Sequence, residues 1–479
     1  MTTTRERSMT ATIEHPSVDD RRALGKDAGY RTPPSSHAGW EPAAHRPDPV
    51  ALLEDQNLTR EQDLVPVRHG RMMVSPFTFY RGAAKIMAAD LKDTPRAGLT
   101  VQLCGDAHLS NFGGFASPER RLMFDVNDFD ETLPGPFEYD VKRMAASFTI
   151  AARNNGFRKA EVRDVTTASV AAYREAMVDF AQMRTLDIWY AHLDEADILA
   201  SARSQEKGKK SKKDVKRAKK TFGKARTRDS LQALSKLAEL VDGKYRIVSQ
   251  PPIVVPLRDL AATDYGLAPE AVGKALHDQF RAYRQTLQND RRQLLERYEL
   301  VDLARKVVGV GSVGTRAFIG LLQGRDGQDP LFLQVKEATA SVLEDHLPKS
   351  RFRQAGERVV QGQRMMQAAS DIFLGWTKGA DVSRHFYWRQ LRDMKGSADV
   401  EAMSPTGLAF YAQTCGWTLA RAHARSGDPI AINAYLGDSD AFDLAITDFS
   451  RRYADQNDRD YDEFVTAIRS GKLQALEGV

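Results

Sequence analysis

The sequence has little cysteine and no long apolar run. Only two of its 479 residues are cysteines, Cys104 and Cys415, which excludes a disulfide framework and a cysteine-rich zinc site. No stretch reaches the roughly 18–20 consecutive apolar residues of a membrane-spanning helix. Residues 1–49 are rich in Thr, Ser, Pro, His and Arg and lack the apolar core of a signal peptide. We therefore expect this segment to be disordered and the protein to be cytoplasmic.

The positive charge of the chain is concentrated in one short segment. Residues 207–228 contain twelve Lys or Arg and one Asp, and subtracting their +11 from the chain's +5 leaves −6 on the rest. The segment holds a single aromatic residue, Phe222, so base stacking is not indicated and the sequence does not favour a nucleic-acid partner. Either a solvated, mobile insertion or a site for an anionic partner would have this composition.

A short motif predicts the chemistry. Residues 103–113 read Leu-Cys-Gly-Asp-Ala-His-Leu-Ser-Asn-Phe-Gly and place an Asp and an Asn five positions apart. Kinase-type active sites use this spacing, so Asp106 would orient a substrate hydroxyl and Asn111 would bind Mg²⁺. His108 would either contact phosphate or brace the loop. A polar capping loop is the structural alternative.

A cluster of carboxylates follows this motif. The sequence predicts a hairpin of residues 112–115 and 122–126, and three aspartates lie at its end: Asp125, Asp128 and Asp130. We assign Asp128 as the main Mg²⁺ ligand, because the second strand ends just before it, and Asp130 to a second metal ion.

A glycine-rich segment with the pattern G-x-G-x-x-G lies two hundred residues later, at the start of a predicted β-hairpin. Its candidate phosphate-binding residues are Gly309, Gly311, Ser312 and Gly314. Glycines allow backbone N–H groups to approach phosphate oxygens, and a hairpin favours a kinase loop over a dinucleotide-binding βαβ unit.

One lysine occupies the strand that follows this hairpin. Lys336 lies at the end of the strand, where a kinase places its phosphate-binding lysine. Glu357, early in the next predicted helix, is the expected ion-pair partner, with Glu337 and Glu344 as competitors.

These motifs resemble known enzymes. Residues 105–111 look like the catalytic loop of aminoglycoside and choline phosphotransferases of the protein-kinase-like superfamily. The chain from about Pro66 onward is similar to a bacterial family, domain of unknown function family 2252. The matching segments are residues 305–316, 334–338, 362–375 and 389–397. The resemblance implies ATP and Mg²⁺ as cofactors, a role for Asp140 twelve residues after Asp128, and a substrate pocket among residues 153–298.

The order of the motifs departs from that superfamily. The catalytic loop precedes the glycine-rich loop, which predicts a circular permutation of a bilobal, kinase-like α+β fold with additional helices. Residues 50–300 would form a C-lobe-like region, residues 301–397 a nucleotide-binding N-lobe-like region, and residues 398–479 would complete the C-lobe. Within the last region, the helix expected over residues 406–424 resembles the one before a kinase catalytic loop.

Two further features bear on this assignment. Cys104 stands where a His or Arg usually precedes the catalytic Asp. Asp428 and Asn433 are also five apart, but no hairpin delivers a carboxylate after them.

The predicted function is Mg²⁺- and ATP-dependent phosphoryl transfer to a hydroxyl group of a small molecule. Nucleotidyl transfer on the same scaffold, or a nucleotide-binding pseudokinase that acts through partners, are the alternatives. The acceptor is not identified by these motifs.

Overall fold

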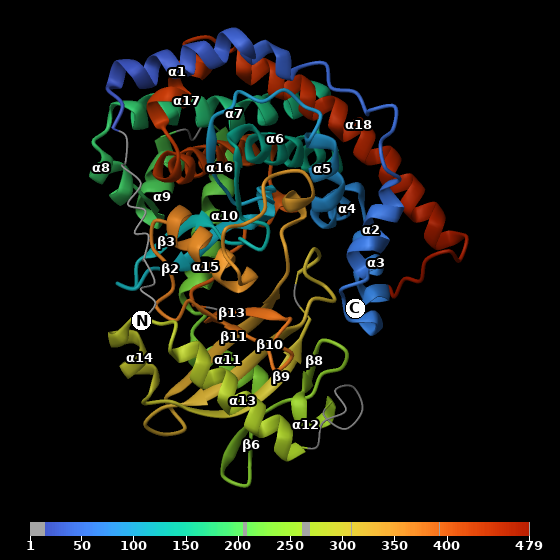
Figure 1. The fold of residues 1–479 in the computed structure, drawn as a ribbon, viewed down its shortest axis with the longest axis vertical. Coiled ribbons are helices and arrows are strands. Elements are labelled where there is room, and N and C mark those ends of the chain that lie inside the picture. Colours follow the sequence, from blue (N-terminus) through green and yellow to red (C-terminus); the bar gives the residue numbers. More distant parts are fainter. Residues whose placement is uncertain (1–14, 205–207, 261–268, 308, 392, 479) are drawn as a thin grey trace, which may run out of the picture.

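The computed structural model describes residues 15–204, 208–260, 269–307, 309–391 and 393–478. They form a mixed α+β structure with two main parts (Figure 1). Layered helices occupy one end, and a six-stranded sheet with helices on both faces occupies the other. No helix in these ranges is both long and apolar enough to cross a membrane.

Four long helices build the core of the helical part. α6 (Phe137–Asn154) is buried along almost its whole length, because apolar or small residues occur on every side of it. It packs against α7 (Lys159–Gln182), α16 (Pro405–Ser426) and α18 (Ala441–Arg469). α16 begins at a serine N-cap followed by proline, a strong start signal in the sequence.

The N-terminal segment is ordered, which corrects the expectation of disorder for residues 15–49; residues 1–14 lie outside the described residues. α1 (Val18–Arg31) lies against α17 (Pro429–Leu436), and a Cβ at Gly25 would lie 2.1 Å from the carbonyl oxygen of Ala431. A few small residues therefore suffice to dock this polar helix. Composition missed the contact because it averages over the helix faces.

The large sheet is antiparallel throughout, in the order β12-β13-β11-β10-β9-β8. Its strands are β8 (Val254–Pro256), β9 (Glu299–Lys306), β10 (Ala317–Gln323), β11 (Pro330–Ala338), β12 (Gly375–Lys378) and β13 (His385–Gln390). The glycine-rich loop joins β9 to β10, as predicted, and Lys336 stands opposite Ala317 near the end of β11. α15 (Ala355–Met366) connects β11 to β12.

Both faces of the sheet carry helices. Phe318 and Leu322 of β10 pack into a cluster with α13 (Pro269–Arg284) and α14 (Asn289–Leu295), whereas Ile319 packs toward α11 (Ser230–Leu237). This period-two alternation is what a sheet buried on both faces requires.

One expected boundary therefore changes. Residues 230–260 and 269–300 lie with the sheet and not with the expected C-lobe-like region, because their apolar side chains belong to the clusters on its two faces. The helices of the second range, α13 and α14, are separated by residues 285–288.

Smaller strands and helices complete the chain. β2 (Phe112–Ala116) and β3 (Leu122–Val126) form the predicted hairpin, and β5 (Leu193–Asp194) adds to it. β1 (Thr100–Leu103) pairs with β4 (Leu133–Pro136). The remaining strands are β6 (Ala238–Val241) and β7 (Lys244–Ile247). The remaining α-helices are α2 (Pro49–Asn57), α3 (Val65–Met72), α4 (Pro76–Gly82), α5 (Ala84–Leu91), α8 (Thr185–Tyr190), α9 (Glu195–Ser204), α10 (Gly208–Arg226) and α12 (Leu257–Leu260).

Candidate functional site

The loop after β1 is held by a buried carboxylate. Asp140, at the start of α6, accepts hydrogen bonds from the backbone N–H groups of Cys104 (2.8 Å) and Gly105 (3.0 Å). Behind it, His423 Nε2 lies 3.2 Å from Asp140 and Tyr173 donates to or accepts from His423 Nδ1 at 2.9 Å. Because these groups are all buried, the loop has a rigid polar support.

A positive backbone φ turns the chain into the motif. Gly105 has a φ of +84°, and a Cβ there would lie 2.1 Å from the carbonyl oxygen of Glu131. Only glycine fits this position. Cys104, directly before it, is fully buried in the helical core, and burial raises the pKa of its thiol, so it stays a thiol and acts as an apolar side chain.

Asp106 faces a cavity and is oriented by an arginine. Arg143 Nε of α6 donates to Asp106 Oδ1 at 2.8 Å, and the Arg143 guanidinium stacks over the Tyr80 ring at 3.9 Å. Asn111 Nδ2 donates to the backbone oxygen of Asp106 at 2.8 Å, which closes the five-residue loop on itself.

His108 braces this loop. Its Nδ1 accepts a hydrogen bond from the backbone N–H of Ser110 at 3.2 Å, and its Nε2 lies 3.7 Å from Asp106. Burial, together with the nearby Arg143 and Arg81 charges, lowers the pKa of His108 well below its usual value. His108 is therefore neutral, and its Nε2 carries the proton.

The three aspartates after β3 have different partners. Asp125 is fully buried, forms a close ion pair with Arg421, and accepts the backbone N–H of Ala368 at 2.9 Å. These contacts make Asp125 a structural residue. Asp128 and Asp130 instead line a cavity.

Lys336 joins the sheet to these carboxylates. Its Nζ donates to Asp130 Oδ2 at 2.6 Å and lies 3.8 Å from Asp128 Oδ2. Tyr387 of β13 donates to the other Asp130 oxygen at 2.6 Å. Burial alone would raise the pKa of Asp130, but the Lys336 charge and these hydrogen bonds hold it below its usual value. Burial and the Asp130 charge raise the pKa of Asp128.

The expected ion pair between Lys336 and Glu357 is wrong. Glu357 makes no such contact, and the carboxylate partners of Lys336 among the described residues are Asp130 and Asp128. The next residue of α15, Arg358, points to this side instead and donates to the backbone oxygens of Thr132 (2.6 Å) and Asp130 (2.8 Å). A one-residue offset on a helix turns the side chain by about 100°, which the sequence pattern did not resolve.

The two competing glutamates are also engaged elsewhere. Glu337 binds Arg316 (3.2 Å) and Arg384 (2.8 Å), and Glu344 lies 3.8 Å from Arg358.

The glycine-rich loop is clamped by the N-terminal helices. The backbone N–H of Glu61 donates to Gly314 O at 2.7 Å, Arg71 donates to Gly309 O at 2.5 Å, and Arg60 donates to Val313 O. Gly309, Gly311 and Ser312 line a cavity, and their role in phosphate binding stays a prediction. Gly314 lines neither of the two cavities described next; its φ of +86° forms the turn that packs on Arg60.

Two cavities meet at Asp128, Gly309 and Ser312. The first, here called the Asp106 cavity, holds the catalytic-loop residues predicted from the sequence. Its principal lining residues are Gln56, Thr59, Arg60, Arg81, Asp106, His108, Asn111, Asp130 and Glu131. The second, the Lys336 cavity, has a volume of about 500 Å³, within the range of small-molecule sites. Its lining residues include Val307, Gln334, Lys336, Gln367, Arg389 and Leu391.

The wall of the Asp106 cavity bears on the predicted substrate pocket. Residues 153–298 were predicted to form that pocket, but none of the described residues that line this cavity lies in that range. The lining residues that precede Asp106 in the chain come from α2, α4, α5 and the segment just after α2.

Mg²⁺ would find suitable ligands at this junction. Asn111 donates through Nδ2, which leaves its amide oxygen available, and Asp128 Oδ2 has only the distant Lys336 contact. Asp130 fits less well than predicted, because Lys336 and Tyr387 occupy both of its oxygens. No group of three or more His, Cys, Asp or Glu with metal-ligand geometry occurs among the described residues. Mg²⁺ commonly takes one or two carboxylates and completes its shell with phosphate and water.

Sequence reasoning missed four cationic residues of the site: Arg60, Arg81, Arg143 and Arg389. Arg389 donates to Gln334 Oε1 at 3.0 Å and to Asn127 O at 3.2 Å. It lies two positions after Tyr387 on β13, so the period-two rule could have placed both on the same face. Arg60 and Arg81 carried no such signal.

The basic segment is a helix. α10 covers residues 208–226, with Val215, Ala218 and Phe222 on the face that packs inward and most of its described lysines exposed. Lys207 lies outside the described residues. The expectation of a mobile insertion is thus replaced by a packed amphipathic helix, while its predicted anionic partner stays a prediction.

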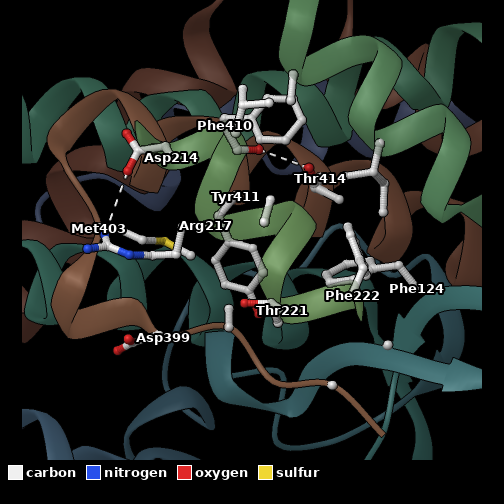
Figure 2. Close-up of a pocket in the computed structure, with 18 of the residues that line it drawn as sticks. Phe124, Asp214, Arg217, Thr221, Phe222, Asp399, Met403, Phe410, Tyr411 and Thr414 are labelled. Carbon is white, nitrogen blue, oxygen red and sulfur yellow. Dashed lines mark hydrogen bonds and ion pairs between the residues drawn. The ribbon is translucent and has the colours of Figure 1, made fainter. Parts of the chain in front are cut away.

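A mostly apolar cavity lies between α10 and α16, lined by Phe124, Phe222, Phe410 and Tyr411 (Figure 2). Tyr411 also donates to the backbone oxygens of Leu109 (2.8 Å) and Phe112 (3.2 Å). The cavity therefore borders the end of the loop that carries Asp106 and Asn111.

The rival motif has a capping role. Asp428 accepts the backbone N–H groups of Ile430 (3.0 Å) and Ala431 (3.2 Å) at the start of α17 and lies 3.6 Å from Arg21. Neither Asp428 nor Asn433 lines the two cavities, so Asp106 and Asn111 remain the candidate pair.

Glu131 makes the stability of the protein depend on pH. Burial raises its pKa to about 7, against an Arg358 charge and a hydrogen bond from the backbone N–H of Val342 that lower it. Because the folded-state pKa is raised, ionisation destabilises the fold as pH rises from about 4.5 to 7. Glu131→Gln is therefore expected to stabilise the protein by about 1–2 kcal/mol at pH 8 and hardly at all at pH 4.5. Urea unfolding at the two pH values measures this difference, and an equal effect at both would contradict it.

The fold and the site together define a mixed α+β protein with a glycine-rich loop, a buried lysine and a carboxylate cluster around two adjoining cavities. The chain belongs to the family described as "Uncharacterized protein conserved in bacteria (DUF2252)", whose model matches residues 60–467. No curated protein and no solved structure matches the chain.

Proposed function

We propose that the protein is an ATP- and Mg²⁺-dependent phosphotransferase that acts on a hydroxyl group of a small molecule. The observation that carries this proposal is the contact of Lys336 Nζ with Asp130, at 2.6 Å, beside the glycine-rich loop and across one cavity from Asp106. These groups come from positions about 200 residues apart, and they are the parts that phosphoryl transfer requires.

The order of elements around the lysine supports this function. A glycine-rich loop joins the first two strands of a meander, the lysine lies on the third strand, and a helix follows it. This is the sequence of parts in a kinase N-lobe. The Lys336 cavity would then hold the nucleotide, with Lys336 near its phosphates.

A circular permutation accounts for the reversed motif order. The backbone N–H of Gln102 in β1 donates to Ser426 Oγ at 3.1 Å, and a Cβ at Gly427 would lie 3.2 Å from Thr100 O. The end of α16 thus lies beside the strand that leads to Asp106. A short link from the end of α16 to β1 would put the glycine-rich loop before the Asp106 motif, which is the motif order of the kinase-like superfamily. The sheet and the helices would then correspond to the two lobes of that fold.

The residues suggest how the hydroxyl is activated. Asp106 would accept a hydrogen bond from the acceptor hydroxyl and take its proton as the hydroxyl oxygen bonds to the γ-phosphorus of ATP. The bond from that phosphorus to the β-phosphate oxygen breaks in the same transfer and ADP leaves, while Arg143 keeps the other Asp106 oxygen in place. Neutral His108 would donate through Nε2 within the same cavity. Mg²⁺, held by Asn111 and Asp128, would neutralise charge on the phosphates.

A pseudokinase is the second candidate, and one observation favours it. Active protein kinases pair the lysine with a glutamate of the following helix, whereas Lys336 pairs with Asp130. Nucleotidyl transfer would use the same groups.

Binding of Mg–ATP to the full chain, measured by calorimetry, tests the proposal. Lys336→Met should weaken binding by about tenfold or more, because it removes a charged hydrogen bond to the phosphates. Lys219→Met, on the exposed face of α10, is the matched control and should bind as the wild type does.

Absence of Mg–ATP binding, or binding that is insensitive to Lys336→Met, would contradict the proposal. A screen of cell metabolite extract with ATP labelled at the γ or the α phosphate then separates the functions. Transfer of the γ label supports phosphoryl transfer, transfer of the α label supports nucleotidyl transfer, and binding without transfer supports the pseudokinase.

A further inference from the structure

One cation of the Asp106 cavity, Arg81, has no hydrogen-bond or ion-pair partner among the described residues. Arg81, near the end of α4, lines this cavity, and its Nε is shielded from solvent without a hydrogen-bond acceptor. No carboxylate of the described residues lies within ion-pair distance of its guanidinium. The Cζ atom of Arg81 lies 6.0 Å from the centre of the Phe77 ring.

Packing holds the backbone of Arg81. α4 begins with a capping box formed by Ser75 and Thr78, and Phe77, Phe79 and Tyr80 are buried beneath it. A Cβ at Gly311 would lie 3.2 Å from the backbone oxygen of Arg81, so the glycine-rich loop borders this residue. The planar guanidinium itself offers five donors in a fixed fork.

Three of the five carboxylates that line the cavity are paired with cations, and the other two are Asp128, the proposed Mg²⁺ ligand, and Glu131. Asp106 is paired with Arg143, and Asp130 is paired with Lys336. Glu337 is paired with Arg316 and with Arg384. An amine-rich acceptor would have to compete with the cations of these ion pairs. An anionic group would instead give the Arg81 guanidinium the hydrogen-bond and charge partner that it lacks among the described residues.

Different carboxylates act on the charges of Arg81 and Lys336. Burial lowers the pKa of Arg81, and the carboxylates that oppose this effect are Asp106 and Glu401. For Lys336 the corresponding carboxylates are Asp128 and Asp130. Arg81 lines the same cavity as Asp106, the candidate base, whereas Lys336 lines the adjoining cavity proposed for the nucleotide.

We infer that Arg81 binds an anionic group, a phosphate or a carboxylate, of the acceptor whose hydroxyl Asp106 activates. The substrate class is therefore a small hydroxylated anion. The conclusion that this anion belongs to a phosphate acceptor rests on the proposed phosphotransferase function. The existence of an anion site at Arg81 does not depend on that function.

Inorganic phosphate is the direct probe. It is titrated by calorimetry into the full chain, both alone and with saturating Mg²⁺ and a non-hydrolysable ATP analogue, which fills the proposed nucleotide site. Arg81→Gln should weaken phosphate binding by about tenfold or more, and Arg81→Lys by less. Arg22→Gln, at an exposed position of α1, is the control and should change nothing.

Folding is checked in the same samples. Because Arg81 has no hydrogen-bond or ion-pair partner in the described part of the chain, Arg81→Gln should leave the melting temperature unchanged or raise it slightly. Mg–ATP affinity should stay within about twofold of the wild type, since Lys336 and the carboxylates are intact.

The two proposals can fail separately. Phosphate binding that Arg81→Gln does not weaken, with or without the analogue, overturns the anion site even if Mg–ATP binds. Absence of Mg–ATP binding by the wild-type chain overturns the proposed function. Phosphate binding that depends on Arg81 would still support the anion site in that case.

The acceptor class is tested by dividing the metabolite extract into anionic, neutral and cationic fractions before the labelled-ATP reaction. Label transfer is expected with the anionic fraction, and Arg81→Gln should raise KM for the acceptor about tenfold or more with little change in kcat. Label transfer confined to the neutral or cationic fraction would overturn the inference. A fall in kcat at unchanged KM in Arg81→Gln would also overturn it, because Arg81 would then act on the phosphate being transferred.

Discussion

Asp106→Asn is expected to lower phosphoryl transfer by about 10²–10⁴-fold while Mg–ATP affinity stays within about twofold. Asparagine keeps the shape of the side chain and can still accept from Arg143, but it cannot take the proton of the acceptor hydroxyl. Asp106 lines the cavity without contacting the lysine cluster, so the nucleotide side should be unaffected. Label transfer and calorimetry on the same preparation measure the two quantities.

The matched control is Asp428→Asn. Asp428 caps α17, and asparagine caps a helix about as well as aspartate does, so activity and stability should both stay as in the wild type. Loss of activity in Asp428→Asn, with activity retained in Asp106→Asn, would refute the assignment of the catalytic loop.

Asp125→Ala and Asp128→Ala should have opposite effects, although only two residues separate them. Asp125→Ala leaves Arg421 buried without its counter-charge and is expected to lower the free energy of unfolding by about 3–5 kcal/mol. Asp128→Ala removes a carboxylate whose pKa is raised by burial and by Asp130, so stability should be unchanged or higher. Urea unfolding of each variant measures this contrast.

Nucleotide binding should show the reverse pattern. Asn111 and Asp128 are the two residues that fit best as Mg²⁺ ligands, and Asp128→Ala leaves only Asn111. This variant is therefore expected to abolish the Mg²⁺ dependence of ATP binding. If Asp125→Ala fails to fold, the double variant with Arg421→Met removes the uncompensated charge and should recover most of the stability. Equal losses of stability in the two single variants would contradict the division between a structural and a metal-binding aspartate.

Local structure was largely readable from the sequence. The hairpin of β2 and β3, the glycine-rich turn between β9 and β10, and the long helix α16 follow from turn residues, alternation and apolar periodicity. These signals depend on neighbours in the chain. The family, too, was identified from motifs and is confirmed over residues 60–467.

The errors arose where distant segments meet. The docking of α1 depends on Gly25 meeting α17, and the partner of Lys336 depends on how α15 is rotated over the sheet. The division between Asp125 and Asp128 required knowing that Arg421, almost 300 residues away, reaches only the first of them. No local pattern carries such information.

The sequence by itself determined the kinds of groups available: an Asp–Asn loop, a glycine-rich turn, a strand-end lysine and a carboxylate cluster. Only the tertiary structure decided which of them share a cavity, that α2, α4 and α5 contribute to its wall, and that Arg81 stands there without an ion-pair partner among the described residues. The physical reason is that charge pairing and burial act through space. A side chain's partners are set by the packing of elements that lie far apart in the chain.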